Sequence, residues 1–269
     1  MGELDGKVAV ITGAASGNGR GIALRFAEEG ADIVIADIDA DRMAETAELV
    51  RGRGRSALLQ RCDVSKKADI DQLISAAVSD FGHVDIAVAN AGVVEMDTDC
   101  LRMTEAQWDR TIGTNLKGVF FTLQAAANQM IAQRRSGRLI ALASIMAEWG
   151  AAGTPAYCAS KGGVKQLVKS FAVACGRYNI TCNAIAPGFI DTGMTQMIKD
   201  TPMLAAQLVD RTPAGRIGDP ADVAHVAAFL ASNASSFMTG TVISPDGGIT
   251  AGMYSATAAA LLAQQAGTG

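Results

Sequence analysis

The chain has 269 residues, of which 49% are hydrophobic and 19% charged, with a formal net charge of −4. This composition allows one large α/β domain with a sizeable core, and the lack of a Lys/Arg-rich stripe excludes nucleic acid as a partner. Only two His residues are present, which excludes a His-based hydrolase and a multi-His metal centre.

Short apolar runs alternate with amphipathic stretches along the chain. The first run, at residues 7–11, has the β-branched, unbroken apolar pattern of a strand buried on both faces. Further strands are expected at residues 33–36, 57–59, 86–89, 138–142, 180–185 and 241–244. Apolar residues at helical spacing predict helices at residues 22–27, 41–51, 70–81, 108–130 (with a break near Gly113), 157–177 and 222–230.

Strands that alternate with helices form right-handed βαβ units and a parallel, doubly wound sheet. We therefore predict an α/β fold, a Rossmann-type seven-stranded parallel sheet with helices on both faces, in a single domain at residues 1–252. No linker, repeat or low-complexity segment appears before residue 250. Residues 253–269 form a C-terminal tail extension, in which residues 255–264 have the composition of a short helix.

A glycine-rich turn follows the first strand and opens a helix, with the sequence Thr12-Gly13-Ala14-Ala15-Ser16-Gly17-Asn18-Gly19. Backbone N–H groups and the positive end of the helix dipole make such a turn a phosphate-binding site. The Gly-x3-Gly-x-Gly spacing differs from the G-x-G-x-x-G fingerprint, and no Gly-Lys-Ser/Thr of a P-loop follows. Taken alone, the turn is also compatible with an ordinary β-to-α connection.

Asp37 ends the second strand, where a carboxylate can accept hydrogen bonds from adenosine ribose hydroxyls. The same charge would repel a 2′-phosphate. No Arg or Lys lies between Gly13 and Gly19, and Ile38 follows Asp37, so the sequence favours NAD over NADP. The spacing of Asp37, Asp39 and Asp41 resembles a calcium loop, but Arg42 stands where that loop needs Gly. We expect no metal site.

Tyr157 and Lys161 lie four residues apart on a predicted helix, so their side chains share one face. A nearby ammonium favours the ionised phenol, which predicts a lowered pKa for Tyr157. Such a phenol can act as a general acid or base near neutral pH. An aromatic ring packed on a snorkelling lysine stem is the alternative interpretation of this pair.

These motifs, taken together and in order, resemble those of the classical short-chain dehydrogenases/reductases. The resemblance covers about residues 5–250. It rests on Thr12-Gly13-x3-Gly17-x-Gly19, Asn90-Ala91-Gly92, Asn115, Ser144, Tyr157-x3-Lys161 and Pro187-Gly188. In two places the chain departs from the family: Asn18 stands where Ile is usual, and Ala89 replaces a frequent Asn.

The resemblance implies a role for each matched residue. Tyr157 would exchange a proton with the substrate oxygen, Ser144 would hold that oxygen, and Lys161 would lower the Tyr157 pKa and bind the nicotinamide ribose. Asn115 would support a water-linked proton relay from Lys161. The cofactor-binding set would be Gly13, Ser16, Gly17, Asn18, Gly19, Asp37, Ile38, Asp63, Val64, Asn90, Ala91, Gly92, Tyr157, Lys161, Pro187, Gly188, Ile190 and Thr192.

The substrate side is harder to interpret from sequence. The resemblance places a pocket around residues 94–97, 145–151 and the segment after residue 188, which supply Val94, Glu95, Met96, Ile145, Met146, Glu148, Trp149, Met194 and Met197. Glu148 and Trp149 suggest a hydroxylated substrate held by hydrogen bonds and ring stacking. A solvated loop charge is the more favoured interpretation of Glu148.

Cysteine usage and the N-terminus bear on localisation. The five Cys residues are odd in number, widely spaced and form no Cys-x-x-Cys, which is typical of a reducing compartment. The chain begins without an apolar signal segment, and no apolar run is long enough to span a bilayer. We expect a cytoplasmic protein with no membrane partner.

The sequence therefore predicts an NAD-dependent oxidoreductase that interconverts a secondary alcohol and a ketone by hydride transfer. A polyol, sugar or cyclic alcohol is the expected substrate, and the family resemblance implies a homotetramer. Two alternatives stay open. One is an NADPH-dependent 3-oxoacyl-thioester reductase, and the other is a catalytically silent dinucleotide-binding protein.

Overall fold

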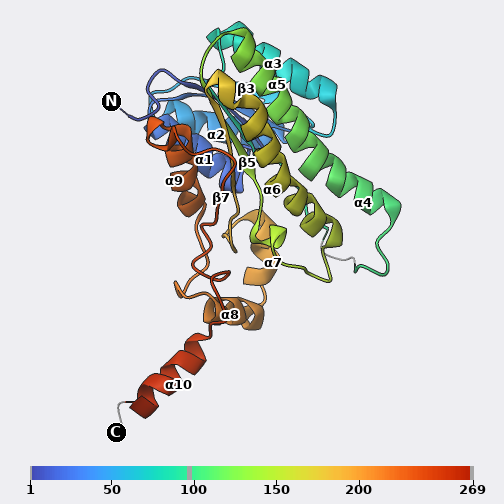
Figure 1. Cartoon of the computed structure of the whole chain (residues 1–269), viewed down its shortest axis with the longest axis vertical. Coiled ribbons are helices and arrows are strands. Elements are labelled where there is room, and N and C mark those ends of the chain that lie inside the picture. The colour runs from blue at the N-terminus through green and yellow to red at the C-terminus, as the bar shows by residue number, and fades with distance from the viewer. Residues whose placement is uncertain (1, 96–98, 267–269) are drawn as a thin grey trace.

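The computed structural model, which describes residues 2–95 and 99–266, is built on one seven-stranded sheet (Figure 1). The strand order is β3-β2-β1-β4-β5-β6-β7, and every neighbouring pair is parallel. The strands are β1 (Val8–Thr12), β2 (Asp32–Asp37), β3 (Ala57–Arg61), β4 (Ile86–Ala89), β5 (Gly137–Leu142), β6 (Ile180–Ile185) and β7 (Val242–Ile243). The predicted Rossmann-type sheet is confirmed, and only β7 is clearly shorter than expected.

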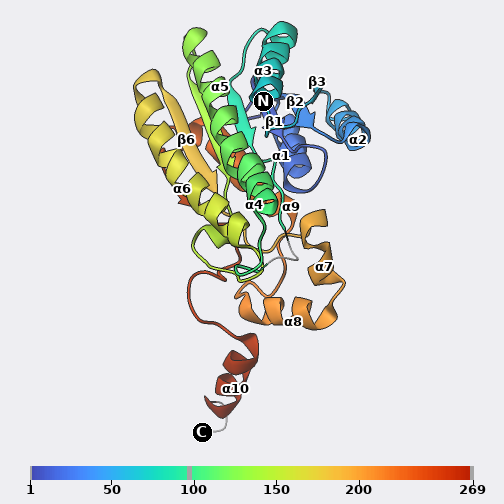
Figure 2. The same ribbon diagram turned by 90° about the vertical axis from the view of Figure 1, so that its right-hand side faces the viewer.

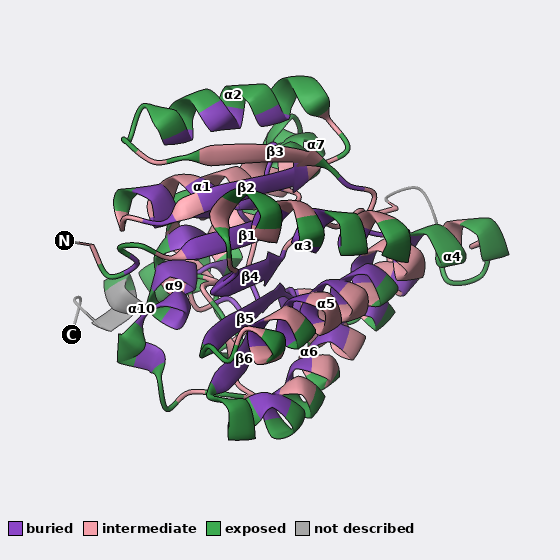
Figure 3. Cartoon of the chain, turned by 90° about the horizontal axis from the view of Figure 1, so that it is seen from above, coloured by how far each residue is buried: buried purple, intermediate pink, exposed green. Residues whose placement is uncertain are grey.

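Helices cover both faces of the sheet (Figure 3). One face carries α3 (Lys67–Phe81), α5 (Val119–Ala132) and α6 (Pro155–Cys175), and the other carries α1 (Gly17–Glu28), α2 (Ala40–Arg51) and α9 (Pro220–Ala231). Alternate residues of each strand therefore enter different cores: Val8 and Val10 pack toward α3 and α5, and Ala9 and Ile11 toward α1 and α9. Burial on both faces explains why the strands are almost continuously apolar.

The long helix predicted around residue 113 is interrupted as expected. Helix α4 (Glu105–Ile112) begins at a capping box formed by Thr104 and Gln107. It continues through a π-helical turn at Gly113–Gly118 into α5. Such turns are rare and occur frequently at functional sites, and this one contains Asn115.

The segment between β6 and α9 contains two helices that were not predicted, α7 (Gln196–Lys199) and α8 (Pro202–Arg211). No residue of α8 is fully buried, but Leu204, Ala205, Leu208 and Val209 recur at helical spacing on one half-buried face. Pro202 in its first turn was the available start signal. The remaining short 3₁₀ turns are Ile145–Ala147, Gly176–Tyr178, Gly193–Thr195 and Asn233–Ser235.

The predicted tail helix is present as α10 (Ala256–Ala266). It points away from the body of the protein in both perpendicular views and lies closest to α8 (Figures 1 and 2). Within the described part of the chain, no helix combines the length and the hydropathy needed to cross a membrane.

Candidate active site

The predicted site residues meet at the carboxyl edge of the sheet. The strand order reverses between β1 and β4, and open α/β sheets bind ligands beyond the strand ends at such a switch point. The glycine-rich turn follows β1, Asn90 follows β4, Ser144 follows β5 and Pro187 follows β6. Ile145 N donates to the Pro187 carbonyl over 3.1 Å, which joins the last two of these strand ends.

The glycines of the turn leave no room for side chains. Gly13 and Gly17 have φ angles of +66° and +53°, a region that favours glycine. A Cβ on Gly19 would lie 2.1 Å from the Gly13 carbonyl oxygen, and one on Gly13 would lie 2.8 Å from the Ala91 Cα. The turn therefore forms a shallow cradle of bare backbone.

Asn90 and Thr12 hold this cradle in place. Asn90 Nδ2 donates to the carbonyls of Thr12 and Gly13 over 2.9 and 3.0 Å. Thr12 Oγ1 accepts from the backbone N–H groups of Asn90 and Ala91 over 3.1 and 3.2 Å. These bonds fix the end of β4 against the end of β1, as expected of a residue that braces the central strands.

The cradle fits the pyrophosphate of a dinucleotide. The side chain of Ser16, at the N-cap of α1, makes no capping hydrogen bond, so no side chain of the helix start occupies the positive end of the dipole. Bare backbone and an uncapped helix start are what a phosphate-binding turn presents before its ligand is bound.

Asp37 lies beside the cradle at the end of β2. Its Oδ2 accepts from Ala15 N over 3.1 Å, and its Oδ1 accepts from Ile38 N over 2.7 Å and from Asp39 N over 3.2 Å. Ile38 is 61% exposed and carries no charge. Arg20 donates to the Ala15 carbonyl over 2.7 Å and pairs with Glu45 at 2.8 Å, and Arg61 lies in register with Asp37 on β3. Among the described residues, no cation is within ion-pair distance of the Asp37 carboxylate.

The remaining predicted cofactor residues lie in the segments that follow three strands, β3, β4 and β6. After β3, Val64 is buried against Gly118, and Asp63 accepts from Ser65 N and Oγ. After β6, Gly188 packs so closely on Asp246 that a Cβ would lie 2.8 Å from the Asp246 Cα. The Thr192 side chain contacts Gly17, Ile190 is buried, and a Cβ on Gly92 would lie 3.3 Å from Asn115 Oδ1.

Ser144, Tyr157 and Lys161 come together where β5 ends and α6 begins. Ser144 is 8% exposed, and its Oγ accepts from Met146 N over 3.1 Å. Lys161 is 4% exposed, donates to the Leu142 carbonyl over 2.7 Å and lies 5.5 Å from the centre of the Tyr157 ring. The expected side-by-side placement of Tyr157 and Lys161 is observed. The Leu142 carbonyl that holds Lys161 is a backbone group, which no side-chain pattern reveals.

The predicted lowering of the Tyr157 pKa was wrong. Burial raises the pKa of the Tyr157 phenol above its usual value, and a hydrogen bond with Ser144 offsets only part of this rise. Burial also lowers the pKa of Lys161 from 10.5 to about 8. Desolvation of both groups therefore outweighs the attraction between ammonium and phenolate on which the prediction was based.

The shifted Lys161 pKa has a consequence for stability. Between about pH 8 and pH 10.5 the unfolded chain binds more protons than the folded chain, so the contribution of Lys161 to stability is lost as pH falls through this window. We therefore compare the unfolding free energy of Lys161→Met with that of wild type. We expect this difference to favour the variant by about 2 kcal/mol more at about pH 7 than at about pH 9.5.

Urea unfolding of wild type and variant at the two pH values measures this difference. Lys169→Met removes an exposed lysine from the same helix and should show no such pH dependence. An unfolding free-energy offset for Lys161→Met that is equal at both pH values would contradict the buried-ammonium account.

Asn115 lies in the π-helical turn, and both its side-chain oxygen and its side-chain nitrogen make a hydrogen bond to Val93. Its Oδ1 accepts from Val93 N over 2.8 Å, and its Nδ2 donates to the Val93 carbonyl over 2.7 Å. Asn115 is completely buried. It ties the loop after β4 to the long helix and makes no direct hydrogen bond to Lys161.

The residues expected to line the substrate pocket differ in exposure and in their partners. Glu148 is exposed and forms an ion pair with Lys165, which agrees with a solvated loop charge. Glu95 is only 19% exposed and pairs with Arg110 at 3.4 Å. Met194 and Met197 are exposed, whereas Met96 lies outside the described residues.

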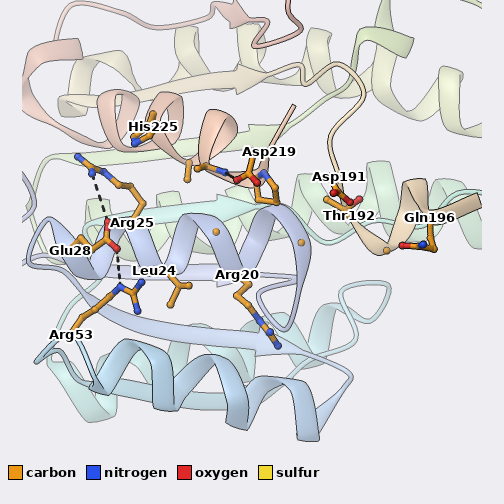
Figure 4. A pocket seen from close by; sticks show the side chains of 16 residues that line it. Arg20, Leu24, Arg25, Glu28, Arg53, Asp191, Thr192, Gln196, Asp219 and His225 are labelled. Carbon is orange, nitrogen blue, oxygen red and sulfur yellow. Dashed lines mark hydrogen bonds and ion pairs between the residues drawn. The ribbon is translucent and has the colours of Figure 1, made fainter. Parts of the chain in front are cut away.

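A pocket of about 580 Å³ lies next to the cradle, between α1, α9 and the segment around Thr192 (Figure 4). Gly17 and Thr192 line it, and so do several charged side chains. Arg25 and Arg53 both pair with Glu28 across its wall (Figure 4). Ser144, Tyr157 and Lys161 are not among its lining residues.

Comparison with known proteins agrees with this geometry. Residues 13–250 match a family model described as enoyl-(acyl carrier protein) reductase. The chain is 42% identical over 245 residues to 2-dehydro-3-deoxy-D-gluconate 5-dehydrogenase of Escherichia coli (strain K12), covering 91% of this chain and 96% of that protein. A short-chain type dehydrogenase/reductase from Mycobacterium marinum has a structure that superimposes with a TM-score of 0.88 at 36% identity, covering 93% and 97% of the two chains.

The chain belongs to the short-chain dehydrogenase/reductase family. Among short-chain dehydrogenases/reductases, it is also 40% identical over 249 residues to 3-oxoacyl-[acyl-carrier-protein] reductase FabG of Thermotoga maritima, covering 91% and 98% of the chains. A putative 2-deoxy-d-gluconate 3-dehydrogenase from Agrobacterium tumefaciens, solved with bound NADP, has a TM-score of 0.86 at 34% identity, covering 93% and 98%. The protein is thus an oxidoreductase that acts on CH–OH groups.

Proposed function

We propose that this protein is an NAD-dependent dehydrogenase that interconverts a secondary alcohol and a ketone. The proposal is carried by one observation: Ser144, Tyr157 and Lys161 lie together at the carboxyl edge of the sheet, beside a backbone cradle suited to a pyrophosphate. In this proposal Asn115, Ser144, Tyr157 and Lys161 form the catalytic set.

The choice of NAD rests on Asp37. Its carboxylate stands next to the cradle, where the adenosine ribose of a dinucleotide lies in this type of fold. A 2′-phosphate would meet this negative charge, and Arg20 is already engaged by Glu45 and the Ala15 carbonyl. No Arg or Lys occupies positions 13–19 to compensate.

Each side chain of the proposed catalytic set has a separate role in the reaction. A bound nicotinamide supplies the hydride acceptor for alcohol oxidation and the hydride donor for ketone reduction. Ser144 and Tyr157 hold the substrate oxygen, and Tyr157 takes the hydroxyl proton as the carbon loses its hydride. Lys161, held by the Leu142 carbonyl beside the Tyr157 ring, would bind the nicotinamide ribose. Asn115 fixes the loop after β4 that borders the site.

A polyol, sugar or cyclic alcohol is the substrate class we propose. The name of the Escherichia coli relative refers to a sugar acid. The cations near the expected substrate side of this chain are paired, Lys165 with Glu148 and Arg110 with Glu95. These pairings favour a neutral hydroxylated substrate over one that is recognised through a carboxylate.

A second candidate is a 3-oxoacyl-thioester reductase that uses NADPH. It is supported by the 40% identity to the Thermotoga maritima FabG protein and by the NADP bound to the Agrobacterium tumefaciens structure. The position of Asp37 favours the NAD-dependent alternative.

Initial rates with a panel of substrates distinguish the two candidates. We expect NADH formation from NAD and at least one polyol, sugar or cyclic alcohol, with a lower kcat/KM for NADP. Faster oxidation of NADPH by a 3-oxoacyl thioester than turnover of any alcohol with NAD would overturn the first candidate in favour of the second.

We also propose a cytoplasmic homotetramer. The five cysteines are free, which fits a reducing compartment. The outer face of the long helix and of α6 exposes Trp108 and Val173, at 42% and 87%, and would pair with the same face of another subunit. The domain limits at residues 1–252 and the separate role of residues 253–269 are part of this proposal.

A further inference from the structure

The segment between β6 and α9 is a long excursion whose two ends are fastened together. Asp191 N donates to the Gly218 carbonyl over 2.8 Å, and Gly218 N donates to the Phe189 carbonyl over 2.9 Å. Beyond this base, α7 and α8 lie past the carboxyl ends of the strands (Figures 1 and 2). Ser144 and the first turn of α6 lie at the same end of the sheet.

Packing alone fixes the far part of this excursion poorly. No residue of α8 is buried, and Met203 in its first turn is 72% exposed. In α7 only Ile198 is buried. Elements with few buried apolar contacts are the ones that open most readily. Leu204, Ala205, Leu208 and Val209 of α8 are half-buried, so its apolar packing is limited and polar contacts made elsewhere add to it.

Those contacts come from the C-terminal tail. Asp210, near the end of α8, accepts hydrogen bonds from Ser255 Oγ (2.8 Å), Thr257 N (2.8 Å) and Thr257 Oγ1 (2.7 Å). The Asp210 carboxylate thus caps the first turn of α10 from a different helix. These hydrogen bonds hold the pKa of Asp210 below its usual value. We call Asp210, Ser255 and Thr257 the tail latch.

The tail is anchored at its other end to the wall of the active site. Asp246 accepts from Gly248 N over 2.8 Å and from Thr250 N over 3.2 Å, and this turn lies directly against Gly188. Ala214 N donates to the Gly247 carbonyl over 3.0 Å. Ile249 is buried. The tail therefore starts at the strand end where Gly188 lies and reaches α8 through the latch.

We propose that the tail latch holds α8 over the mouth of the active site, and that Asp210 is a positioning residue for substrate. This inference rests on the proposed function for its kinetic consequence only. With the latch open, α8 loses one of its attachments to the tail, while the Ala214–Gly247 hydrogen bond just after it remains. Part of the substrate binding energy then goes into ordering α8, which raises KM. The cradle and Tyr157 have separate supports, so kcat and the affinity for NAD should change little.

Hydrogen–deuterium exchange on the full chain, with steady-state kinetics, tests the latch. The variants are Asp210→Ala, Thr257→Val and Asp210→Asn, which retains one carbonyl acceptor. The matched control is Asp200→Ala, since Asp200 lies in the same excursion but accepts a hydrogen bond only from Gln196 Nε2, four residues earlier, over 2.9 Å. For Asp210→Ala we expect faster exchange in α8 and a KM raised about five-fold, with kcat within about two-fold.

Thr257→Val should shift exchange and KM in the same direction by less, and Asp210→Asn should restore part of both. Unchanged exchange of α8 in Asp210→Ala, or the same change in Asp200→Ala, would overturn the latch. The exchange measurement needs no substrate. Latch-dependent exchange without turnover of any alcohol therefore supports the latch and contradicts the proposed function.

Discussion

Tyr157→Phe is expected to lower kcat for alcohol oxidation about a thousand-fold, the scale of a lost general acid–base group. The phenol is the only group in the proposed mechanism that takes the hydroxyl proton, and Phe keeps the ring volume beside Lys161 while removing the oxygen. The affinity for NAD should stay within about two-fold, because the cradle formed by Gly13, Gly17 and Gly19 is untouched.

Tyr178→Phe is the matched control for this change. Tyr178 follows the far end of α6, and its ring stacks with the Arg177 guanidinium at 4.7 Å. Its loss of a hydroxyl should leave kcat unchanged. Full activity in Tyr157→Phe would remove the proton-transfer role assigned to this residue.

The raised pKa of Tyr157 adds a pH dependence to the same prediction. The phenol must be deprotonated to accept a proton from the alcohol, and burial favours its protonated form. The rate of oxidation by wild type should therefore rise with pH above neutrality, and the rate of ketone reduction should fall. In Tyr157→Phe the residual rate should lose this pH dependence.

Asp37→Ser should reverse the preference between the two dinucleotides. Removing the carboxylate deletes a charged acceptor for ribose hydroxyls, which lowers kcat/KM with NAD about thirty-fold. It also removes the charge that would repel a 2′-phosphate. We expect the ratio of kcat/KM for NAD over NADP to fall by at least about a hundred-fold.

Asp39→Ser provides the control for the cofactor change. Asp39 is the N-cap of α2 and accepts from Arg42 N over 3.1 Å, a role that Ser fulfils equally well. It should keep the preference of the wild type for NAD. An Asp37→Ser variant that still prefers NAD to the wild-type degree would show that this carboxylate does not select the cofactor.

Much of the fold was predictable because its determinants are local. The strand at residues 180–185 was predicted at its observed bounds, since β-branched and apolar residues there are bounded by Asn179 and Pro187. The break near Gly113 appeared as a π-helical turn. The glycine-rich turn could be interpreted before the structure because positive φ angles and backbone contacts both require glycine.

The failures concern long-range effects. The lowered Tyr157 pKa was inferred from spacing alone, and the burial that reverses it depends on how α6 packs on β5. Helix α8 is an exception, since it was not predicted although Leu204, Leu208 and Val209 recur at helical spacing. The tail latch joins Asp210 to Thr257 across a distance in sequence that no local pattern spans.

The most direct test of the account is the fate of the carbinol hydrogen. Wild-type protein is mixed with NAD and the best alcohol of the panel, deuterated at the carbinol carbon, and the NADH formed is analysed by mass spectrometry. Direct hydride transfer predicts that the NADH carries the deuterium, and that Tyr157→Phe forms very little of it. NADH without the label, or binding of NAD with no turnover of any alcohol, would contradict the account.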